Sequence, residues 1–246
     1  MSELIIKNFS AGINDNKIIS EINLRIKSGE IHIIMGPNGS GKTTFAKAIM
    51  KYPKLKTTGN IILDRKDITR LSTDKKAKLG LFLQFQNPSE ISDVKYINFL
   101  YNAYTSIKKG GNIENLEKEI EINLKKLDLK KEIIERDLNF GFSGGEKKKM
   151  EIMQMLTLNP KFAILDEPDS GLDVDAIKNI AEILNESIKK KKLGVILITH
   201  YNKIISYIKP DFVHVLVNGK IVASGKESIA KEIETEGFEK YIKNKV

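Results

Sequence analysis

Cysteine is absent from the 246-residue chain, so neither a disulfide bond nor a thiolate-held metal or iron–sulfur cluster can form on it. Long apolar runs are also missing: residues 195–198 form one of the longest, against the roughly 18 residues that a membrane span needs. The first six residues show no basic stretch followed by an apolar one, so we expect no secretory signal. These absences predict a cytoplasmic protein with no direct membrane insertion.

Arginine is scarce, although the chain is basic with a formal net charge of +9. Only Arg25, Arg65, Arg70 and Arg136 are arginine among the 41 Lys and Arg residues. A basic surface is typical of nucleic-acid-binding proteins, but recognition of bases and phosphates favours the bidentate guanidinium group over lysine. We therefore interpret most of the lysines as solvated surface and expect no specific nucleic-acid partner.

Short β-rich runs recur along the chain and are separated by helical stretches. They lie at residues 4–9, 22–26, 30–35, 60–63, 81–84, 162–166, 195–199, 213–217 and 220–223. The runs at 162 and 195 are almost entirely apolar, as expected of parallel strands covered on both faces, which predicts an α/β core. Asn218-Gly219 joins the last two runs and predicts a type I′ hairpin, so an antiparallel element closes the sheet.

Helical periodicity replaces the strand pattern between residues 87 and 159, and residues 137–141 are expected to form a loop. We therefore expect one domain in which an α/β nucleotide-binding core, residues 1–86 and 160–246, carries an inserted helical subdomain, residues 87–159. The apolar positions with helical spacing are interpreted as core of this insert rather than as a partner-binding stripe. They are Ile113, Leu116, Ile120, Leu124 and Leu127.

A glycine-rich loop at residues 36–43 follows the apolar strand 30–35 and opens a helix near Lys42, which is the context that a Walker A loop requires. Such a loop turns its N–H groups toward phosphate oxygens, while Lys42 reaches the β- and γ-phosphates and Thr43 offers a hydroxyl to Mg²⁺. The alternative is an ordinary glycine-rich turn. We expect the nucleotide contacts to come from Gly36, Pro37, Asn38, Gly39, Ser40, Gly41, Lys42, Thr43 and Thr44.

A second strand, residues 162–166, ends in two carboxylates and is typical of a Walker B strand. Asp166 is expected to approach Mg²⁺, and Glu167 to polarise the attacking water as the general base. The alternative is an acidic strand-to-helix turn with Asp173 capping the next helix. The pairing with a Walker A loop favours the catalytic interpretation.

A second glycine-rich helix start, residues 142–146, contains Ser143, Gly144 and Gly145. It predicts a second anion site, and the alternative is a capping box between Ser143 and Glu146. Two phosphate-type loops separated by a helical insert resemble the ATP-binding cassette (ABC) family from residue 4 to about residue 225. That resemblance implies a P-loop NTPase core with a RecA-like, mainly parallel sheet and an antiparallel β subdomain. It also implies a Mg²⁺-dependent ATPase whose second loop serves the nucleotide of a second subunit in an ATP-dependent head-to-tail dimer.

The resemblance supplies further site residues. Gln86 is similar to the family's Q-loop glutamine, which contacts Mg²⁺ and water, and the neighbouring Gln84 is the less favoured candidate. Asp173 falls in the D-loop, and His200 is similar to the switch histidine that holds the γ-phosphate. Ile13 stands where many family members stack an aromatic on adenine, so weak base selectivity is expected. His32 and His214 are assigned no role.

Three stretches resemble the SufC-type ATPases of the SUF iron–sulfur cluster assembly machinery: residues 80–86, 141–148 and 209–215. Glu146 with its lysine run, and Asp169, are also SufC-like. The resemblance implies partners similar to the SufB and SufD scaffold proteins, which would hold the cluster that this cysteine-free chain cannot. Pro168 fits the general ABC pattern better and favours the rival, an ATP-binding subunit of a membrane transporter. A third class, a non-enzymatic nucleotide-dependent binding module, is disfavoured by Glu167.

Overall fold

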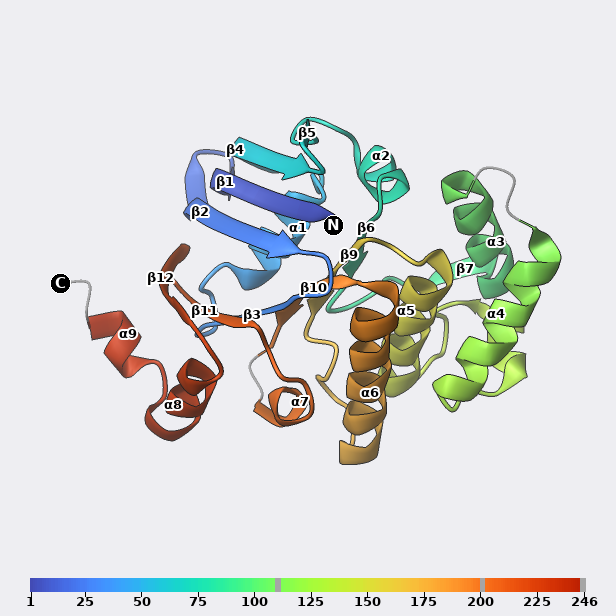
Figure 1. The fold of residues 1–246 in the computed structure, drawn as a ribbon. Helices are drawn as coiled ribbons and strands as arrows, with labels where there is room; N and C mark the ends of the chain where they lie inside the picture. The colour runs from blue at the N-terminus through green and yellow to red at the C-terminus, as the bar shows by residue number, and fades with distance from the viewer. Residues whose placement is uncertain (109–111, 200–201, 244–246) are drawn as a thin grey trace.

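A computed structural model describes residues 1–108, 112–199 and 202–243. Its centre is a six-stranded sheet in the order β12-β11-β3-β10-β9-β6, parallel except for β12 (Figure 1). All residues of β3, β9 and β10 are buried, as their apolar sequences predict. These strands are β3 (Ile31–Met35), β6 (Leu81–Gln84), β9 (Phe162–Asp166), β10 (Gly194–Ile198), β11 (Phe212–Val217) and β12 (Lys220–Gly225).

An antiparallel sheet in the order β2-β1-β4-β5 lies beside the central sheet, with α1 (Lys42–Ile49) packed between the two. One apolar cluster joins Ile6 of the second sheet, Phe45 of α1 and Ile196 of the central sheet. The predicted α/β fold class, with a mainly parallel sheet and an antiparallel one, is therefore confirmed. The antiparallel strands are β1 (Glu3–Ile13), β2 (Asn16–Lys27), β4 (Leu55–Leu63) and β5 (Lys66–Asp67).

Helices cover the other face of the central sheet (Figure 1). They are α5 (Gly144–Leu158), α6 (Val174–Lys191), α7 (Asn202–Tyr207), α8 (Ser228–Glu236) and α9 (Glu239–Lys243). The short α2 (Thr73–Lys78) leads into β6. Among the helices of the described residues, none combines the length and the apolar character that crossing a membrane demands.

The segment between β6 and β9 is mostly helical and extends to one side of the sheet (Figure 1). It contains β7 (Ile91–Lys95), α3 (Tyr96–Ile107), α4 (Ile113–Lys126), the 3₁₀ helix η1 (Lys131–Glu135), β8 (Asp137–Leu138) and α5. The division of the chain into a core and an inserted subdomain stays a prediction.

Two expectations for this segment were wrong in detail. Residues 137–138 belong to a strand that pairs with β7. The sequence did not predict this pair because β7 is exposed throughout, so its residues do not alternate between apolar and polar as those of a half-buried strand do. Ile113 is 53 % exposed, whereas Leu116, Ile120, Leu124 and Leu127 are buried. Ile113 is the first residue of α4, directly after the N-cap Asn112. At this end of the helix its side chain does not pack against the core, which the helix contacts from Leu116 onward.

The hairpin between β11 and β12 has the predicted geometry. Asn218 and Gly219 both have positive φ angles, 47° and 76°, as a type I′ turn requires. A Cβ on Gly219 would lie 2.1 Å from the carbonyl oxygen of Ile18, so only glycine fits there. Gly219 N–H also donates to the Ser40 carbonyl over 3.0 Å, which ties the hairpin to the glycine-rich loop.

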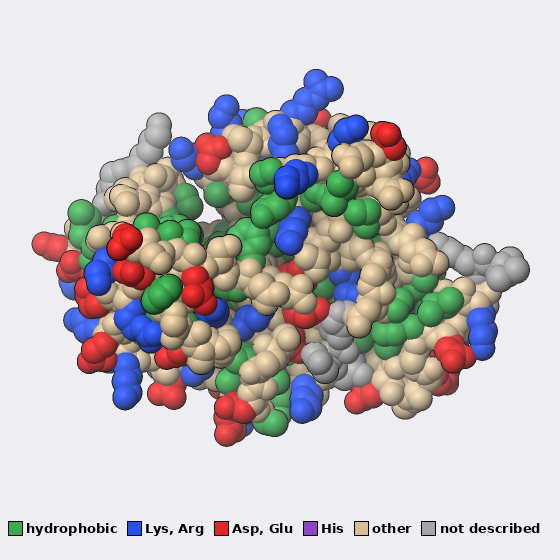
Figure 2. All heavy atoms as spheres, turned by 180° about the vertical axis from the view of Figure 1, so that it is seen from behind, with side chains coloured by type: hydrophobic (Ala, Val, Ile, Leu, Met, Phe, Trp, Pro, Cys, Tyr) green, Lys and Arg blue, Asp and Glu red, His purple; other side chains and the backbone are tan. Residues whose placement is uncertain are grey.

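The face opposite to that of Figure 1 shows Lys and Arg side chains interspersed with Asp and Glu (Figure 2). Several groups of hydrophobic side chains lie among them. On this face the two signs of charge are mixed, as is typical of a solvated surface.

Candidate nucleotide site

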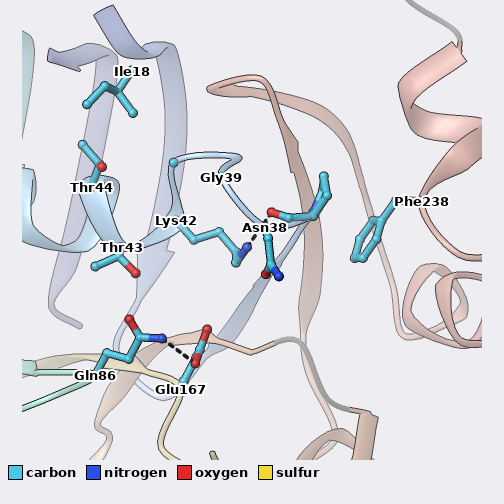
Figure 3. Close-up of a pocket in the computed structure, with 11 residues that line it drawn as sticks. Ile18, Asn38, Gly39, Lys42, Thr43, Thr44, Gln86, Glu167 and Phe238 are labelled. Carbon is cyan, nitrogen blue, oxygen red and sulfur yellow. Dashed lines mark hydrogen bonds between the residues drawn. The ribbon is translucent and has the colours of Figure 1, made fainter.

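The loop between β3 and α1 borders a cavity of about 840 Å³ (Figure 3). Its backbone depends on glycine at the N-cap of α1, because Gly41 has a φ of 101° and a Cβ there would lie 2.8 Å from Ile19 Cγ2. Seven of the nine loop and helix residues predicted to contact nucleotide line the cavity, while Gly36 and Ser40 do not line it and instead accept hydrogen bonds from Lys42 Nζ. The seven are Pro37, Asn38, Gly39, Gly41, Lys42, Thr43 and Thr44.

Lys42 runs back under this loop from the first turn of α1. Its Nζ donates to the carbonyl oxygens of Gly36 and Pro37 over 2.8 Å and 2.9 Å, and the residue is 5 % exposed. Burial lowers the pKa of Lys42 to about 8, and the carboxylates of Glu167 and Asp166 oppose that shift. A nearby anion would favour the charged ammonium further, so the position suits phosphate.

Two carboxylates stand at the carboxyl end of β9. Asp166 is 2 % exposed and Glu167 is 7 % exposed. Burial raises the pKa of Asp166, and the nearby Thr43 hydroxyl opposes the rise. Glu167 has a φ of 52°, in the left-handed region that non-glycine residues rarely adopt, and its N–H donates to the carbonyl of Ile198 over 2.9 Å. Backbone strain of this kind often accompanies functional residues, so it adds to the case for Glu167.

These oxygens fit a magnesium ion. Asp166 Oδ1 is buried and has no hydrogen-bond partner among the described atoms. The Asp166 side chain also lies close to the Thr43 hydroxyl. Mg²⁺ takes oxygen ligands and is commonly held by one or two protein groups together with phosphates. Within the described ranges, no group of three or more His, Cys, Asp or Glu side chains could hold a metal ion.

Gln86 lines the same cavity, beyond the end of β6, and its Nε2 donates to Glu167 Oε2 over 2.7 Å (Figure 3). Gln84, the less favoured candidate, is a fully buried residue of β6 and is not among the residues that line the cavity. The geometry therefore favours Gln86 over Gln84 as the site glutamine.

The second glycine-rich loop lies elsewhere. Ser143 and Gly145 line a separate cavity of about 490 Å³ together with Asp173. Ser143 is the N-cap of α5 and forms a capping box with Glu146, and Asp173 caps α6 by accepting the Ala176 N–H over 2.8 Å. Both capping interpretations are thus correct as local structure. Ser143, Gly144, Gly145 and Asp173 are not among the residues that line the Lys42 cavity.

Sequence reasoning missed two cavity residues, Ile18 of β2 and Phe238, which follows α8. Phe238 stands near Asn38 on the opposite side of the cavity from Ile18 (Figure 3). No sequence signal connects residue 238 with the loop, because the contact is purely tertiary. Ile13, expected near the base, is 45 % exposed at the end of β1 and is not among the lining residues. His200 lies outside the described residues.

Comparison with known proteins identifies the family. The sequence profile of a family described as "ABC transporter" matches residues 19–170. Vegetative protein 296 of Bacillus subtilis is 43 % identical over 242 residues, covering 97 % of this chain and 92 % of that protein. The probable ATP-dependent transporter ycf16 of Antithamnion sp. is 45 % identical over 242 residues, covering 96 % of each. A probable ABC transporter ATP-binding protein of Streptococcus pyogenes is 44 % identical and covers 97 % of this chain and 94 % of its own length.

Solved structures agree. An ATP-binding cassette of an ABC transporter in its ADP conformation has a TM-score of 0.76 and 26 % identity, covering 98 % of this chain and 99 % of that one. A dimeric cassette bound to ADP and phosphate has a TM-score of 0.78 at 23 % identity, covering 91 % of this chain and 98 % of that one. The chain belongs to the ABC transporter family and is an ATP-hydrolysing enzyme of the ABC class.

Proposed function

We propose that this chain is the ATP-hydrolysing subunit of a cytoplasmic SUF-type system and drives rearrangement of a SufB–SufD-like scaffold during iron–sulfur cluster assembly. One contact carries the proposal: Lys148 Nζ donates to the carbonyl oxygen of Gln86 over 2.7 Å. Lys148 and Gln86 come from two separate SufC-like stretches, residues 141–148 and 80–86. Two of the three stretches that resemble SufC therefore touch each other, and the Gln86 side chain in one of them donates to Glu167.

The proposed hydrolysis uses four residues that line the cavity, Lys42, Thr43, Gln86 and Glu167, together with Asp166 and His200. Lys42 binds the β- and γ-phosphates of ATP. Thr43, Asp166 and Gln86 would hold Mg²⁺, which would neutralise phosphate charge when bound. Glu167 accepts a proton from the attacking water, and Gln86 orients that water through its contact with Glu167. His200 is proposed to hold the γ-phosphate.

A second copy of the chain is proposed to complete each site. The loop of Ser143, Gly144 and Gly145, with Asp173 beside it, opens on a cavity of its own rather than on Lys42. A head-to-tail dimer would bring this loop of one copy over the nucleotide of the other, where the α5 N-terminus favours phosphate. The solved dimeric cassette bound to ADP and phosphate supports this arrangement through its fold.

A docking face for the scaffold is proposed around Gln86. Tyr52 and Phe85 are 44 % and 37 % exposed, and their rings meet edge to face with centroids 6.4 Å apart. Ile91 and Val94, in the strand that follows, are 44 % and 37 % exposed. Exposed apolar side chains that contact each other, as Tyr52 and Phe85 do, are typical of protein-binding sites.

The second candidate is an ATP-binding subunit of a membrane transporter. The names of the streptococcal and ycf16 relatives favour it, because they describe an ABC transporter ATP-binding protein and an ATP-dependent transporter. The same docking face would then meet an integral membrane protein, and Pro168 fits this candidate.

The test measures how a purified soluble SufB–SufD complex changes ATP hydrolysis by this chain. Stimulation of the wild type, its loss in Tyr52→Ala and its retention in Tyr207→Ala would support the SUF proposal. Tyr207 is a matched control, because it is 37 % exposed and lies in α7 on the other side of the central sheet (Figure 1). If the wild type neither binds nor responds to the scaffold, the SUF proposal is wrong and the transporter candidate replaces it.

A further inference from the structure

Glu151 is a buried carboxylate that neither the predicted chemistry nor the capping of α5 uses. It lies on α5 and is 4 % exposed. Its Oε1 accepts the backbone N–H of Phe85 over 3.1 Å, and its Oε2 has no hydrogen-bond partner among the described atoms. A buried carboxylate costs free energy to desolvate, so one that accepts a backbone N–H from a loop is expected to serve that loop.

The loop held by Glu151 is the one that carries Gln86. Phe85 directly precedes Gln86, and Lys148, one helical turn before Glu151, donates to the Gln86 carbonyl over 2.7 Å. The Phe85 N–H and the Gln86 carbonyl, which belong to consecutive residues, are therefore both hydrogen-bonded to side chains of α5. The Gln86 side chain donates to Glu167 Oε2 over 2.7 Å (Figure 3).

We propose that Glu151 is a positioning residue for ATP hydrolysis: by holding the Phe85 N–H, it sets where the Gln86 amide stands relative to Glu167. The inference rests on the proposed role of Gln86. Glu151 itself touches neither the cavity nor a residue predicted to bind phosphate, since it is not among the lining residues. Its effect is therefore expected on the rate of hydrolysis rather than on nucleotide affinity.

The test compares five purified full-length variants with the wild type: Glu151→Met, Glu151→Gln, Gln86→Ala, the double variant Glu151→Met/Gln86→Ala, and Thr157→Val. Methionine fills the volume of Glu151 but lacks an oxygen acceptor, whereas glutamine keeps one. Thr157 is the matched control, because it is a fully buried polar residue of α5 whose hydroxyl accepts from Asn123 Nδ2 over 3.3 Å, away from this loop. Single-turnover rates and the KM for MgATP are measured for each.

We expect Glu151→Met to lower the rate about ten-fold with KM changed by less than about two-fold. Glu151→Gln should restore most of the rate, and Thr157→Val should hydrolyse ATP like the wild type. In the Gln86→Ala background, Glu151→Met should cause no further loss, because the group that it positions is gone.

Independent, multiplying losses in the double variant would overturn the positioning role, as would a Glu151→Gln rate as low as that of Glu151→Met. A change confined to KM would overturn it too. A wild-type rate in Gln86→Ala would instead contradict the proposed role of Gln86, and Glu151 would then have no group to act through.

Discussion

Gln86 Nε2 donates a 2.7 Å hydrogen bond to Oε2 of Glu167, although the two residues are 81 positions apart in the chain. The bond joins the loop after β6 to the strand end that carries the general-base candidate. Glu167 also occupies a left-handed backbone conformation, with a φ of 52°. The position of its carboxylate is therefore set both by this backbone conformation and by the hydrogen bond from Gln86. Removing the carboxylate charge should therefore affect the chemistry more than the fold.

Glu167→Gln should keep ATP binding and lose hydrolysis by a factor of about 100 or more, because the attacking water loses its base while Lys42, Thr43 and Asp166 remain. Nucleotide affinity and single-turnover hydrolysis are the two measurements. Glu186→Gln is the control, since Glu186 pairs with Lys126 and Lys190 on the surface. Near-normal hydrolysis by Glu167→Gln would remove Glu167 from the catalytic role.

Lys42→Ala should weaken ATP binding itself, by roughly 10- to 100-fold, because it removes a charge-assisted contact to the phosphates. Equilibrium binding of a fluorescent ATP analogue measures the loss. Lys47→Ala changes a lysine of the same helix that stands 5.4 Å from the Tyr52 ring centroid, and it should bind normally. Equal affinities for the two variants would mean that Lys42 does not meet phosphate.

The stability of the fold should fall in acid through His214. Its pKa is lowered to about 4, first by burial and then by His32, whose Nδ1 lies 3.0 Å from His214 Nε2. Between the ordinary histidine pKa of about 6.5 and this folded value, the unfolded chain binds a proton that the folded chain does not. The stabilising effect of His214 is therefore present at higher pH and lost as the pH falls through that window.

Urea unfolding of the wild type and His214→Gln at several pH values measures this effect. The difference in unfolding free energy should shift against the wild type by about 2 kcal/mol between about pH 7.5 and about pH 5. Ser224→Ala, which removes the hydroxyl 2.8 Å from His214 Nδ1 but leaves the imidazole, should retain the pH dependence. A difference between wild type and His214→Gln that is the same at every pH would show that His214 is not protonated on unfolding.

The sequence predicted those parts of the fold and site whose signal is local. The glycines in the loop from Gly36 to Thr43 indicate a phosphate-binding turn by themselves. Strand β9 could be recognised because a buried parallel strand has a continuous apolar sequence, and Asp166 follows that apolar run. Asn218-Gly219 predicted its turn because both positions need positive φ. The sequence signal for each of these features is local, although contacts with Ile18 and Ile19 also require glycine at positions 219 and 41.

The remaining features depend on tertiary contacts that no local pattern shows. Phe238 reaches the cavity from the end of α8, and His32 meets His214 across 182 positions, so neither could be predicted. Glu151 stands in a helix rich in charged residues, where a glutamate is normally read as solvated, yet it is 4 % exposed. The strand pair β7–β8 was missed because its residues are mostly exposed.

The composite site formed by two copies is the central claim, and mixing two inactive variants tests it most directly. Lys42→Ala disables the phosphate loop, and Ser143→Arg disables the loop proposed to serve the partner. A mixed dimer keeps one complete site, made from Lys42 of one copy and Ser143 of the other. An equal mixture should therefore recover roughly a quarter of wild-type ATP hydrolysis, since about half of randomly formed dimers are mixed and each has one of two sites intact. A mixture as inactive as either parent would contradict the account.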